Sequence, residues 1–444
     1  MSQPLPAHIW PLTATIANGR LHLGGCDVEA LAARYGTPLY VFDEATLRGA
    51  MRAYQAAFRA QGLPFRVHYA AKALLNTAIA QLVATEGLGL DVVSGAELDV
   101  ARRAGIPMAH VHLHGNAKRT EELARAVAWG VGAVVVDNLD ELDRLAALTA
   151  RHTSPQGVLL RLAPNIAAHT HAHIATGGAD AKFGLPLEAL DQAVEHVLAA
   201  PGLRLRGLHA HIGSQLFALD QLRATMAVLV EQAARLRTRY ALTVEELSPG
   251  GGLGVPSLAE QAPPDLDAYA EVLARTLRAG CAAHSLPLPY LTVEPGRSIV
   301  ARAGVALYTI VARKLTADGR PCYLHIDGGM ADNIRPALYD ARYSAVLASR
   351  ADAAPGPPVS VAGRYCEAGD VLLRAVSLPI ARPGELLAVA TAGAYTLSMA
   401  STYNLVPRPA VVLVAGGRAR LIQRRETEAE LLARDLRLDE VSDD

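Results

Sequence analysis

The sequence has few lysines, few cysteines and no long hydrophobic run. Its four cysteines lie far apart and form no CxxC pair, which argues against a disulfide framework or a zinc knuckle and fits a reducing compartment. No apolar run is long enough to span a bilayer. The opening segment, MSQPLPAHIWPL, lacks the basic and apolar pattern of a secretion signal. We therefore expect a cytoplasmic protein.

Excess charge of either sign is also missing. The formal net charge of the 444 residues is −1 and the pI is about 7.0. This balance gives no electrostatic case for binding nucleic acid or an anionic membrane. Hydrophobic residues make up 51% of the chain, which is typical of a globular protein, and the length favours two domains.

The scarcity of lysine draws attention to the stretch FRVHYAAKALLN, which contains Lys72. Four of the 42 basic residues are lysines, which leaves 38 arginines; the lysines are Lys72, Lys118, Lys182 and Lys314. A lysine, unlike an arginine, can lose its proton and form a Schiff base. The alternative is a solvated cap at the end of a strand. Lys182, in the glycine-flanked segment AKFG, is the second candidate for Schiff-base chemistry.

The middle of the chain alternates short apolar runs with amphipathic helical stretches. Eight such runs are FRVHYA, LGLDVV, AHVHLHG, GAVVVDN, GVLLRLAPN, LRGLHAHIGS, LTVEELSPGGG and LPYLTVEPGR. Strand–helix alternation predicts a parallel sheet, and eight units over about 250 residues match a (β/α)₈ TIM barrel. The rival, a doubly wound open sheet, would need a glycine-rich phosphate loop after the first strand, and none is present.

After Arg297 the pattern changes to strands separated by turns, with no long helix before ETEAELLARDL near the end. The N-terminal segment TATIANGRLHLGG predicts a β-hairpin around Asn18 and Gly19. We expect it to join the C-terminal strands. The predicted domains are a barrel over 43–299 and a discontinuous, mostly β domain over 1–42 and 300–444, of the β-sandwich or β-barrel kind.

The carboxyl ends of the predicted barrel strands are rich in functional side chains, as expected for the active-site face of such a barrel. Gly250–Gly252 lets backbone N–H groups approach a ligand, although three glycines can also simply make a tight turn. Arg297 and Ser214 follow neighbouring strands and could contact an anion. We interpret this group as a phosphate site.

A phosphate site beside a strand-end lysine suggests pyridoxal 5′-phosphate. That cofactor needs a lysine for its Schiff base and an acidic partner for its ring nitrogen. Lys72 and Glu294 can supply these groups, and His211 could lie against the ring. A strand-end histidine is also often a hydrogen-bonded structural residue.

A second histidine pattern, HTHAH, contains His169, His171 and His173 at alternating positions, as metal ligands on one strand would be. No carboxylate or cysteine cluster with ligand spacing lies nearby, and the segment reads as a loop. We expect no metal.

These residues lie in a series of motifs that identifies a family. The motifs are HYAAK, LDVVSGAEL, HGNAK, HTHAHIATGGADAKFG, HAHIGSQ, PGGGLG, EPGRSIV, DGGMADNIRPALYDA, CEAGD and AGAYTLSMASTYN. The chain resembles diaminopimelate decarboxylases, which belong to the ornithine, arginine and diaminopimelate decarboxylases. The resemblance runs from Gly36–Glu44 to Arg408–Val414. It implies an alanine-racemase-like fold, the fold type III of pyridoxal-phosphate enzymes.

The resemblance also implies roles for individual residues. Lys72 would carry the cofactor, His211 would stack on its ring and Glu294 would contact the ring nitrogen. The other implied cofactor contacts are Ser214, Gly252, Gly296, Arg297 and Tyr395. The implied substrate contacts are Arg297, Arg335, Tyr339, Glu367 and Tyr395. Cys366 and Glu367 would come from the other subunit of a homodimer, with Cys366 as the catalytic proton donor.

The implied reaction is decarboxylation of meso-2,6-diaminopimelate to L-lysine, the last step of lysine biosynthesis. Arg335 favours this substrate over ornithine, because the distal carboxylate of diaminopimelate needs a cation where ornithine has an ammonium group. A related decarboxylase acting on D-ornithine, lysine or a carrier-bound amino acid is one alternative. An amino-acid racemase and a non-catalytic carrier of the cofactor are others; the CEAGD motif argues against the racemase.

Overall fold

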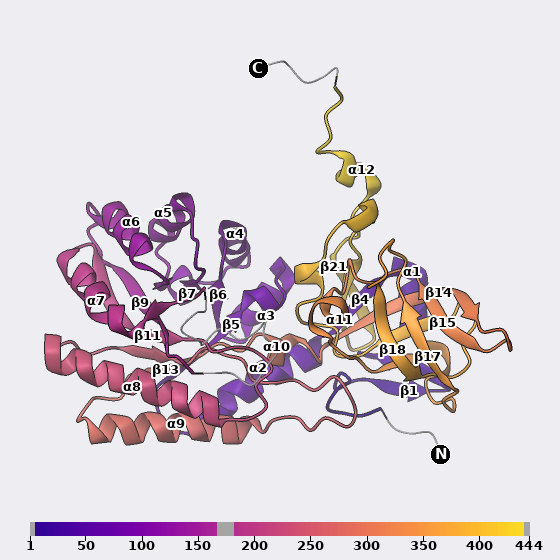
Figure 1. Ribbon diagram of the computed structural model, residues 1–444, viewed down its shortest axis with the longest axis horizontal. Coiled ribbons are helices and arrows are strands. Elements are labelled where there is room, and N and C mark those ends of the chain that lie inside the picture. Colours follow the sequence, from indigo (N-terminus) through magenta and orange to yellow (C-terminus); the bar gives the residue numbers. More distant parts are fainter. Residues whose placement is uncertain (1–4, 167–181, 439–444) are drawn as a thin grey trace. The chain divides into compact units, whose positions relative to one another are not determined.

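The computed structural model describes residues 5–166 and 182–438 (Figure 1). It divides into two compact units. The barrel unit comprises Arg48–Val255 and Pro263–Ile299, and the β unit comprises Met1–Leu47, Pro256–Ala262 and Val300–Asp444. The histidines of the HTHAH segment lie outside the described residues.

The barrel unit contains a parallel sheet that closes on itself. The strands follow the order β9-β11-β12-β13-β5-β6-β7-β8, and β8 pairs with β9 to complete the barrel. They are β5 (Phe65–Ala70), β6 (Gly89–Val92), β7 (Val111–Leu113), β8 (Ala133–Val136), β9 (Gln156–Ala163), β11 (Leu203–Ala210), β12 (Glu246–Ser248) and β13 (Tyr290–Val293). A two-residue strand, β10 (Leu185–Pro186), adds to β9. The predicted (β/α)₈ barrel is confirmed, and each of the eight apolar runs contributes one strand.

Buried strands and capped helices explain this alternation. Strands such as β6 and β8 are buried along their whole length, as expected for a parallel sheet covered by helices. The loops after β5, β6 and β8 each end in a side chain that accepts a backbone N–H of the next helix. These caps are Asn76, Ser94 and Asn138. They fix where each helix begins and hold the preceding loop against the strand end.

Helices cover the outside of the barrel, and α8 packs along α9 (Figure 1). They are α2 (Glu44–Ala60), α3 (Thr77–Thr85), α4 (Gly95–Arg103), α5 (Thr120–Trp129), α6 (Leu139–Thr149), α7 (Leu190–Ala199), α8 (Asp220–Tyr240), α9 (Leu266–Ala283) and α10 (Arg297–Val300). Within the described residues, no helix combines the length and the apolar character needed to cross a membrane.

The β unit begins with the predicted hairpin. Strands β1 (Thr15–Ala17) and β2 (Arg20–Leu23) pair antiparallel across Asn18 and Gly19, both at positive φ, and β3 (Cys26–Asp27) completes this small sheet. Helix α1 (Val28–Tyr35) follows. Apolar side chains of the hairpin share a core with later strands of the unit, including Leu21, Leu23, Val305 and Val412.

The larger sheet of the β unit joins strands from both ends of the chain. Its order is β18-β17-β15-β14-β4-β20-β21, and β19 pairs with both β14 and β16. The strands are β4 (Leu39–Asp43), β14 (Gly304–Leu315), β15 (Pro321–Ile326), β16 (Ala345–Leu347), β17 (Pro358–Ala362), β18 (Val371–Ser377), β19 (Leu386–Val389), β20 (Ala410–Ala415) and β21 (Arg418–Gln423). The predicted mostly β part is confirmed. The sequence did not predict β4, β16 or β18.

Helices in the C-terminal part of the β unit are short. They are α11 (Arg335–Tyr339) and α12 (Glu428–Leu432). The helix expected for ETEAELLARDL is therefore only five residues long. Thr427 and Glu430 form a capping box at its start, so the local signal for a helix start was correct although the helix soon ends.

Candidate active site

Lys72 lies directly beyond the carboxyl end of β5, in a single 3₁₀ turn over Ala71–Ala73. Ala71 and Ala73 are buried, whereas the lysine is exposed. The hydroxyl of Tyr69 donates to the carbonyl of Leu74 at 2.6 Å and pins the turn to the strand. The backbone is thus anchored on both sides of a lysine whose side chain stays accessible.

Lys118, also in the barrel unit, has a different environment. It is buried, and its Nζ donates to Gly115 O, Val135 O and Glu141 Oε1 at 2.6–2.7 Å. Burial lowers the pKa of Lys118, although the charge of Glu141 opposes the shift. All three donors of this ammonium group are therefore used within the fold, and Lys118 is a structural residue. Lys182 is exposed, with its amine 4.8 Å from the ring centroid of Phe183.

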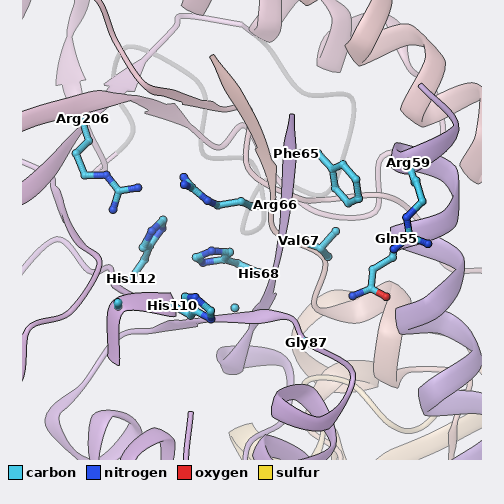
Figure 2. A pocket seen from close by; sticks show the side chains of 12 residues that line it. Gln55, Arg59, Phe65, Arg66, Val67, His68, Gly87, His110, His112 and Arg206 are labelled. Carbon is cyan, nitrogen blue, oxygen red and sulfur yellow. The ribbon is translucent and has the colours of Figure 1, made fainter. Parts of the chain in front are cut away.

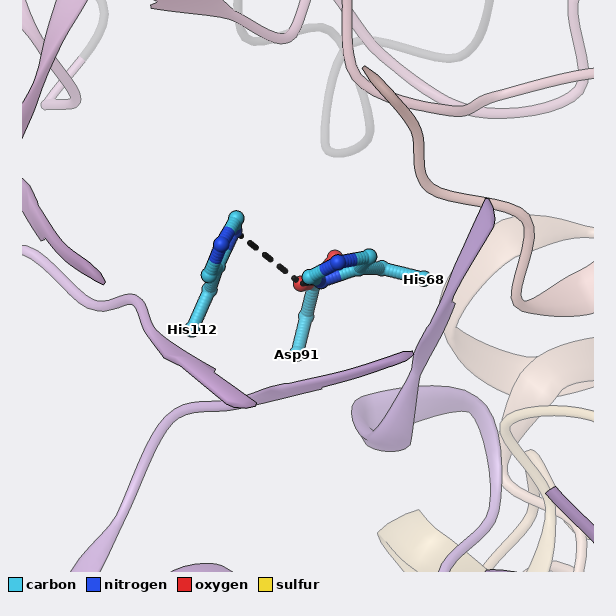
Figure 3. Close-up of side chains that lie close together, drawn as sticks. All are labelled: His68, Asp91 and His112. Carbon is cyan, nitrogen blue, oxygen red and sulfur yellow. Dashed lines mark hydrogen bonds and ion pairs between the residues drawn. The ribbon is translucent and has the colours of Figure 1, made fainter. Parts of the chain in front are cut away.

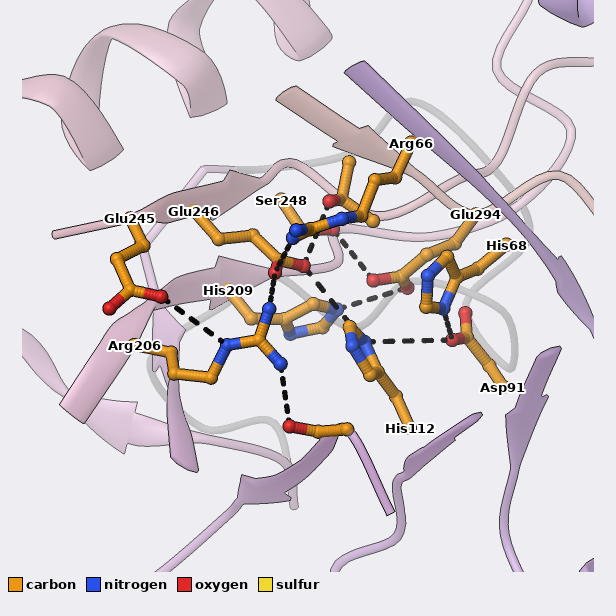
Figure 4. A network of polar contacts seen from close by, with 12 residues as sticks. Arg66, His68, Asp91, His112, Arg206, His209, Glu245, Glu246, Ser248 and Glu294 are labelled. Atoms are coloured by element: carbon orange, nitrogen blue, oxygen red, sulfur yellow. Dashed lines mark hydrogen bonds and ion pairs between the residues drawn. The ribbon is translucent and has the colours of Figure 1, made fainter. Parts of the chain in front are cut away.

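Glu294 follows β13 and is buried. Its Oε1 accepts from Ser248 Oγ at 2.6 Å, and its Oε2 lies 3.1 Å from His209 Nε2 (Figure 4). Burial alone would raise the pKa of Glu294, but the contact with His209 and the charge of His114 outweigh it and lower the pKa. Burial lowers the pKa of His209. Both pKa shifts fit a neutral His209 that donates a hydrogen bond from Nε2 to an ionised Glu294.

His211 lies one residue beyond β11, on the same face of the chain as His209. Its Nδ1 accepts from the amide of Gly251 at 3.3 Å. Burial, together with the nearby charge of Lys72, lowers the pKa of His211 well below its usual value. The ring is therefore neutral and held by a backbone contact, and Lys72 is close enough to influence it.

The glycines after β12 are required by close backbone contacts. A Cβ atom at Gly252 would lie 2.3 Å from Gly213 O, and one at Gly251 would lie 2.1 Å from Glu294 O. Gly252 also has φ of +109°. Only glycine fits, so the loop presents bare backbone at the carboxyl end of the barrel.

Arg297 and Ser214 meet beside this loop. The Nε and Nη2 atoms of Arg297 lie 3.2 and 3.1 Å from Ser214 Oγ. Gly296, just before Arg297, is closely packed, because a Cβ atom there would lie 3.1 Å from Ala70 and Ala73. This tight approach brings the end of β13 against the end of β5, the strand that leads to Lys72.

The predicted cofactor residues of the barrel therefore follow four adjacent strands. Strands β11, β12, β13 and β5 are hydrogen-bonded neighbours in that order. Parallel strands end at the same edge of a sheet, so their following residues gather at one face. The residues that gather there are Lys72, His211, Ser214, Gly252, Glu294, Gly296 and Arg297.

The remaining predicted residues belong to the β unit. Arg335 begins α11 and is buried; its Nε and Nη1 have no hydrogen-bond partner among the described residues, and its guanidinium lies 5.8 Å from the ring centroid of Tyr339. Tyr395 has φ of +56°, an uncommon conformation for a tyrosine that is often found at functional sites.

Cys366 and Glu367 are exposed. The amide of Cys366 donates to Asn404 Oδ1 at 3.1 Å, and Tyr403 donates to the Cys366 carbonyl at 3.3 Å. The buried carboxylate of Asp370 accepts the amide of Tyr365 at 2.9 Å and holds the other side of this turn. The backbone around the thiol is therefore fixed, although the thiol itself is exposed.

The sequence reasoning missed the polar partners that surround Glu294. No role was expected for Ser248, His209 or His114. In the structure the rings of His114 and His209 lie 5.1 Å apart, and His114 Nε2 lies 3.5 Å from Asp91 Oδ1. The spacing of the histidines could have revealed these partners. His112 and His114 are two residues apart, as are His209 and His211, so the members of each pair face the same side of their strand.

Comparisons with known proteins show which family the chain belongs to. Residues 44–301 match the family model for the pyridoxal-binding domain of pyridoxal-dependent decarboxylases. The chain is 45% identical to the diaminopimelate decarboxylase of Actinosynnema pretiosum subsp. auranticum, covering 97% of this chain and 96% of that one. It is 41% identical to that of Bacillus subtilis (strain 168), covering 94% and 96%.

A solved structure is similar over the whole fold. Diaminopimelate decarboxylase from M. jannaschii in complex with L-lysine superposes with a TM-score of 0.90 at 33% identity, covering 96% of this chain and 98% of that one. The similarity in sequence and the similarity in fold therefore indicate the same family. The chain belongs to the diaminopimelate decarboxylase family of pyridoxal-dependent decarboxylases.

Proposed function

We propose that this protein removes one carboxylate from meso-2,6-diaminopimelate and releases L-lysine and CO₂, the last step of lysine biosynthesis. The observation that carries the proposal is the buried, ionised Glu294 at the same barrel edge as the accessible Lys72. The curated relatives named for this activity and the related structure that holds L-lysine support it.

The barrel residues fit pyridoxal phosphate. The loop at Gly252 is a backbone cradle that a single Cβ atom would fill, as a phosphate site requires. Arg297 and Ser214 add a guanidinium and a hydroxyl beside it. Lys72 is the accessible amine at the same edge and would hold the cofactor covalently.

When bound, pyridoxal phosphate supplies an electron-withdrawing ring that takes up the electron pair left behind by the departing carboxylate. Glu294, kept ionised by its neighbours, would hold a proton at the ring nitrogen. His211 is neutral, so it can lie against the ring without adding a positive charge. Ser248 and His209 orient the Glu294 carboxylate through its two oxygens.

Arg335 would select the substrate. Two of its guanidinium nitrogens have no hydrogen-bond partner among the described residues. This buried cation can therefore donate hydrogen bonds to a carboxylate of the substrate. Diaminopimelate offers a distal carboxylate, whereas ornithine and lysine offer an ammonium group that Arg335 would repel. Tyr339 lies beside the guanidinium, and we assign it and Tyr395 to the same substrate-binding set.

We assign the proton that replaces the lost carboxylate to Cys366. Its Sγ–H would donate to the carbon from which CO₂ has left, so one C–C bond breaks and one C–H bond forms. The exposure of Cys366 and Glu367 is compatible with their completing the site of a second subunit in a homodimer. The chain's four free cysteines are compatible with a cytoplasmic location.

Substrate competition tests the assignment. The holoenzyme should release CO₂ from meso-diaminopimelate and form L-lysine, with little release from ornithine, lysine or arginine at equal concentration. Arg335→Gln should raise KM for meso-diaminopimelate by about 10- to 100-fold, since a charged hydrogen bond to the substrate is lost. Faster release from ornithine, lysine or arginine would overturn the assignment, as would interconversion of amino-acid enantiomers without CO₂.

A mixing experiment tests the shared site. Lys72→Ala and Cys366→Ala proteins should each be inactive, and unfolding and refolding them together should restore part of the activity. In a homodimer with shared sites, some mixed dimers contain one site with both native residues. No recovery, with each variant refolded alone as a control for yield, would count against shared sites.

A further inference from the structure

A cavity lies at the opposite end of the barrel from the candidate active site. Its volume is about 320 Å³, and it is lined by residues at the starts of β5, β6 and β7, together with side chains from α2 and β11 (Figure 2). Arg66, the second residue of β5, lines it, whereas Lys72 follows the end of the same strand. At about 3.3 Å per residue, the four steps from Arg66 to the strand end at Ala70 alone span roughly 13 Å.

Basic side chains dominate the lining. Arg59, Arg66, Arg206, His68, His110 and His112 all contribute to it. The guanidinium groups of Arg66 and Arg206 and the rings of His68 and His112 point toward one another in Figure 2. The charges of Arg66 and Arg206 in one cavity are costly unless anions compensate them.

The anionic groups nearby only partly compensate this charge. One buried carboxylate, Glu246 Oε2, serves both Arg66 at 2.6 Å and Arg206 at 3.0 Å (Figure 4). The Nε of Arg206 has no hydrogen-bond partner among the described residues, and the carboxylate of the half-exposed Glu245 is 3.8 Å away. Arg59 is exposed and forms no ion pair with any residue that the structure describes.

Two histidines add to this interior. His68 Nδ1 lies 3.0 Å from Asp91 Oδ1, so the negative charge of Asp91 is paired with His68. His112 is almost fully buried, and its Nδ1 has no hydrogen-bond partner among the described residues; Asp91 Oδ1 is 4.0 Å from it (Figure 3). A buried polar atom left unpaired at a cavity wall commonly has a partner that a protein-only structure does not contain.

The histidines and Asp91 could also bind a metal ion. The ligand atoms of His68, Asp91 and His112 all lie within 4.8 Å of one another. However, three arginines line the cavity and would repel a dication, and Asp91 Oδ1 already accepts from His68. The surrounding charge therefore favours an anion.

We propose that the cavity at the amino-terminal end of the barrel binds a small anion that carries a phosphate or carboxylate group. Arginine presents planar, paired donors that match both groups. The volume lies at the lower end of the range for small-molecule sites and suits a compact ligand. This site is separate from the predicted cofactor and substrate residues.

Calorimetric titration of the holoenzyme with inorganic phosphate tests the proposal. Bound cofactor fills the other phosphate site, so the signal reports the new one. At constant ionic strength we expect saturable binding at one site per chain. Malonate, titrated in parallel, distinguishes a carboxylate-specific site from a phosphate-specific one, and chloride controls for unspecific charge effects.

Two arginine variants locate the binding. Arg59→Gln changes an exposed side chain on α2 and should weaken binding about fivefold, while Arg66→Gln should weaken it tenfold or more. Arg103→Gln removes an equally exposed arginine from α4, which does not line the cavity, and should leave binding unchanged. If Arg66→Gln does not fold, Arg59→Gln alone decides.

Three results would overturn the proposal. The first is no binding of phosphate or malonate up to about 10 mM. The second is binding that Arg59→Gln and Arg66→Gln leave unchanged, which would place an adventitious ion elsewhere. The third is saturable binding of Zn²⁺ that His112→Gln abolishes, which would make the cavity a metal site.

Discussion

The two ends of the same barrel carry opposite kinds of polar chemistry. At the carboxyl end, a buried carboxylate, Glu294, is surrounded by a serine hydroxyl and imidazoles, beside bare glycine backbone. At the amino end, two arginines surround Glu246. The first arrangement places an ionised acid at the strand ends, near Lys72, whereas the second shares one acid between two arginines beside the amino-terminal cavity.

Alternation along the strands produces both ends. In β5, Arg66 and His68 lie two residues apart, so they share a face, and Lys72 follows in the turn after the strand. Glu246 and Ser248 do the same in β12. One inward-facing row of side chains therefore supplies structure at one end and chemistry at the other. Substitutions at the carboxyl end should therefore lower activity, whereas substitutions at the amino end should lower stability.

The largest effect is expected for Lys72→Arg. Arginine keeps the positive charge but stays protonated and forms no Schiff base, so decarboxylation should fall by at least about 10³-fold and the visible absorbance of the bound cofactor should be lost. Steady-state CO₂ release and an absorbance spectrum measure both. Lys182→Arg is the matched control and should retain both signals; the reverse pattern would move the catalytic lysine to 182.

Glu294→Gln should have the next largest effect. Glutamine keeps the shape and can still accept from Ser248, but it loses the charge that would hold the ring nitrogen protonated. We expect kcat to fall by about 10²- to 10³-fold with little change in thermal stability. An unchanged kcat would show that the carboxylate has only a structural role.

Glu246→Gln should show the opposite pattern at the amino end. It would leave Arg66 and Arg206 without their shared buried anion, which typically costs about 3 kcal/mol of unfolding free energy. Chemical denaturation of the holoenzyme measures this loss, while kcat of the folded fraction should stay near the unmodified value. A large loss of kcat at unchanged stability would break the distinction between the two ends.

Gly252→Ala tests the backbone cradle. The added methyl group would lie 2.3 Å from Gly213 O, so we expect affinity for pyridoxal phosphate to fall about 10- to 100-fold, measured by titrating apoenzyme with cofactor. Gly105→Ala is the control, since Gly105 also has positive φ but no atom within 4 Å of its added Cβ. Equal losses in the two variants would mean that backbone strain alone, not the cradle, sets affinity.

The smallest effect concerns pH. Burial alone would lower the pKa of His68, but its hydrogen bond to Asp91 outweighs burial and raises the pKa. A raised folded-state pKa gives stability that is fully present below the unfolded value, about 6.5, and is lost as pH rises through the folded value.

The difference in Tm between the unmodified protein and His68→Gln should therefore shrink as pH rises above about 6.5. Thermal melts across this range measure the difference. A difference that grows with pH would contradict the assignment.

The fold was largely readable from periodicity, and the exceptions have physical causes. Eight apolar runs ending in polar residues predicted the barrel strands, because a covered parallel sheet needs fully buried strands. Strand β4 was missed because Leu39–Asp43 precedes the strand–helix alternation of the barrel, and its partners β14 and β20 lie far away in the sequence. Strand β18 was missed because much of Val371–Ser377 is not buried.

The site was readable only in part. Lys72, Gly252 and Glu294 stand at strand ends and could be found from the barrel pattern. The partners of Glu294 could not, because they depend on which strands are neighbours: β11 lies beside β12, with His209 opposite Ser248, and β12 lies beside β13. The order and register of the strands place His209, Ser248 and Glu294 together. Neither can be predicted from the sequence of a single segment.

The roles assigned to individual residues stay predictions, and reductive trapping tests the central one directly. Treating the holoenzyme with borohydride fixes a Schiff base as a stable secondary amine, and mass spectrometry of the digested protein locates it. The account predicts a pyridoxyl-phosphate adduct on the peptide that contains Lys72 and none on the peptides that contain Lys118 or Lys182. An adduct on Lys182 with Lys72 unmodified would contradict it.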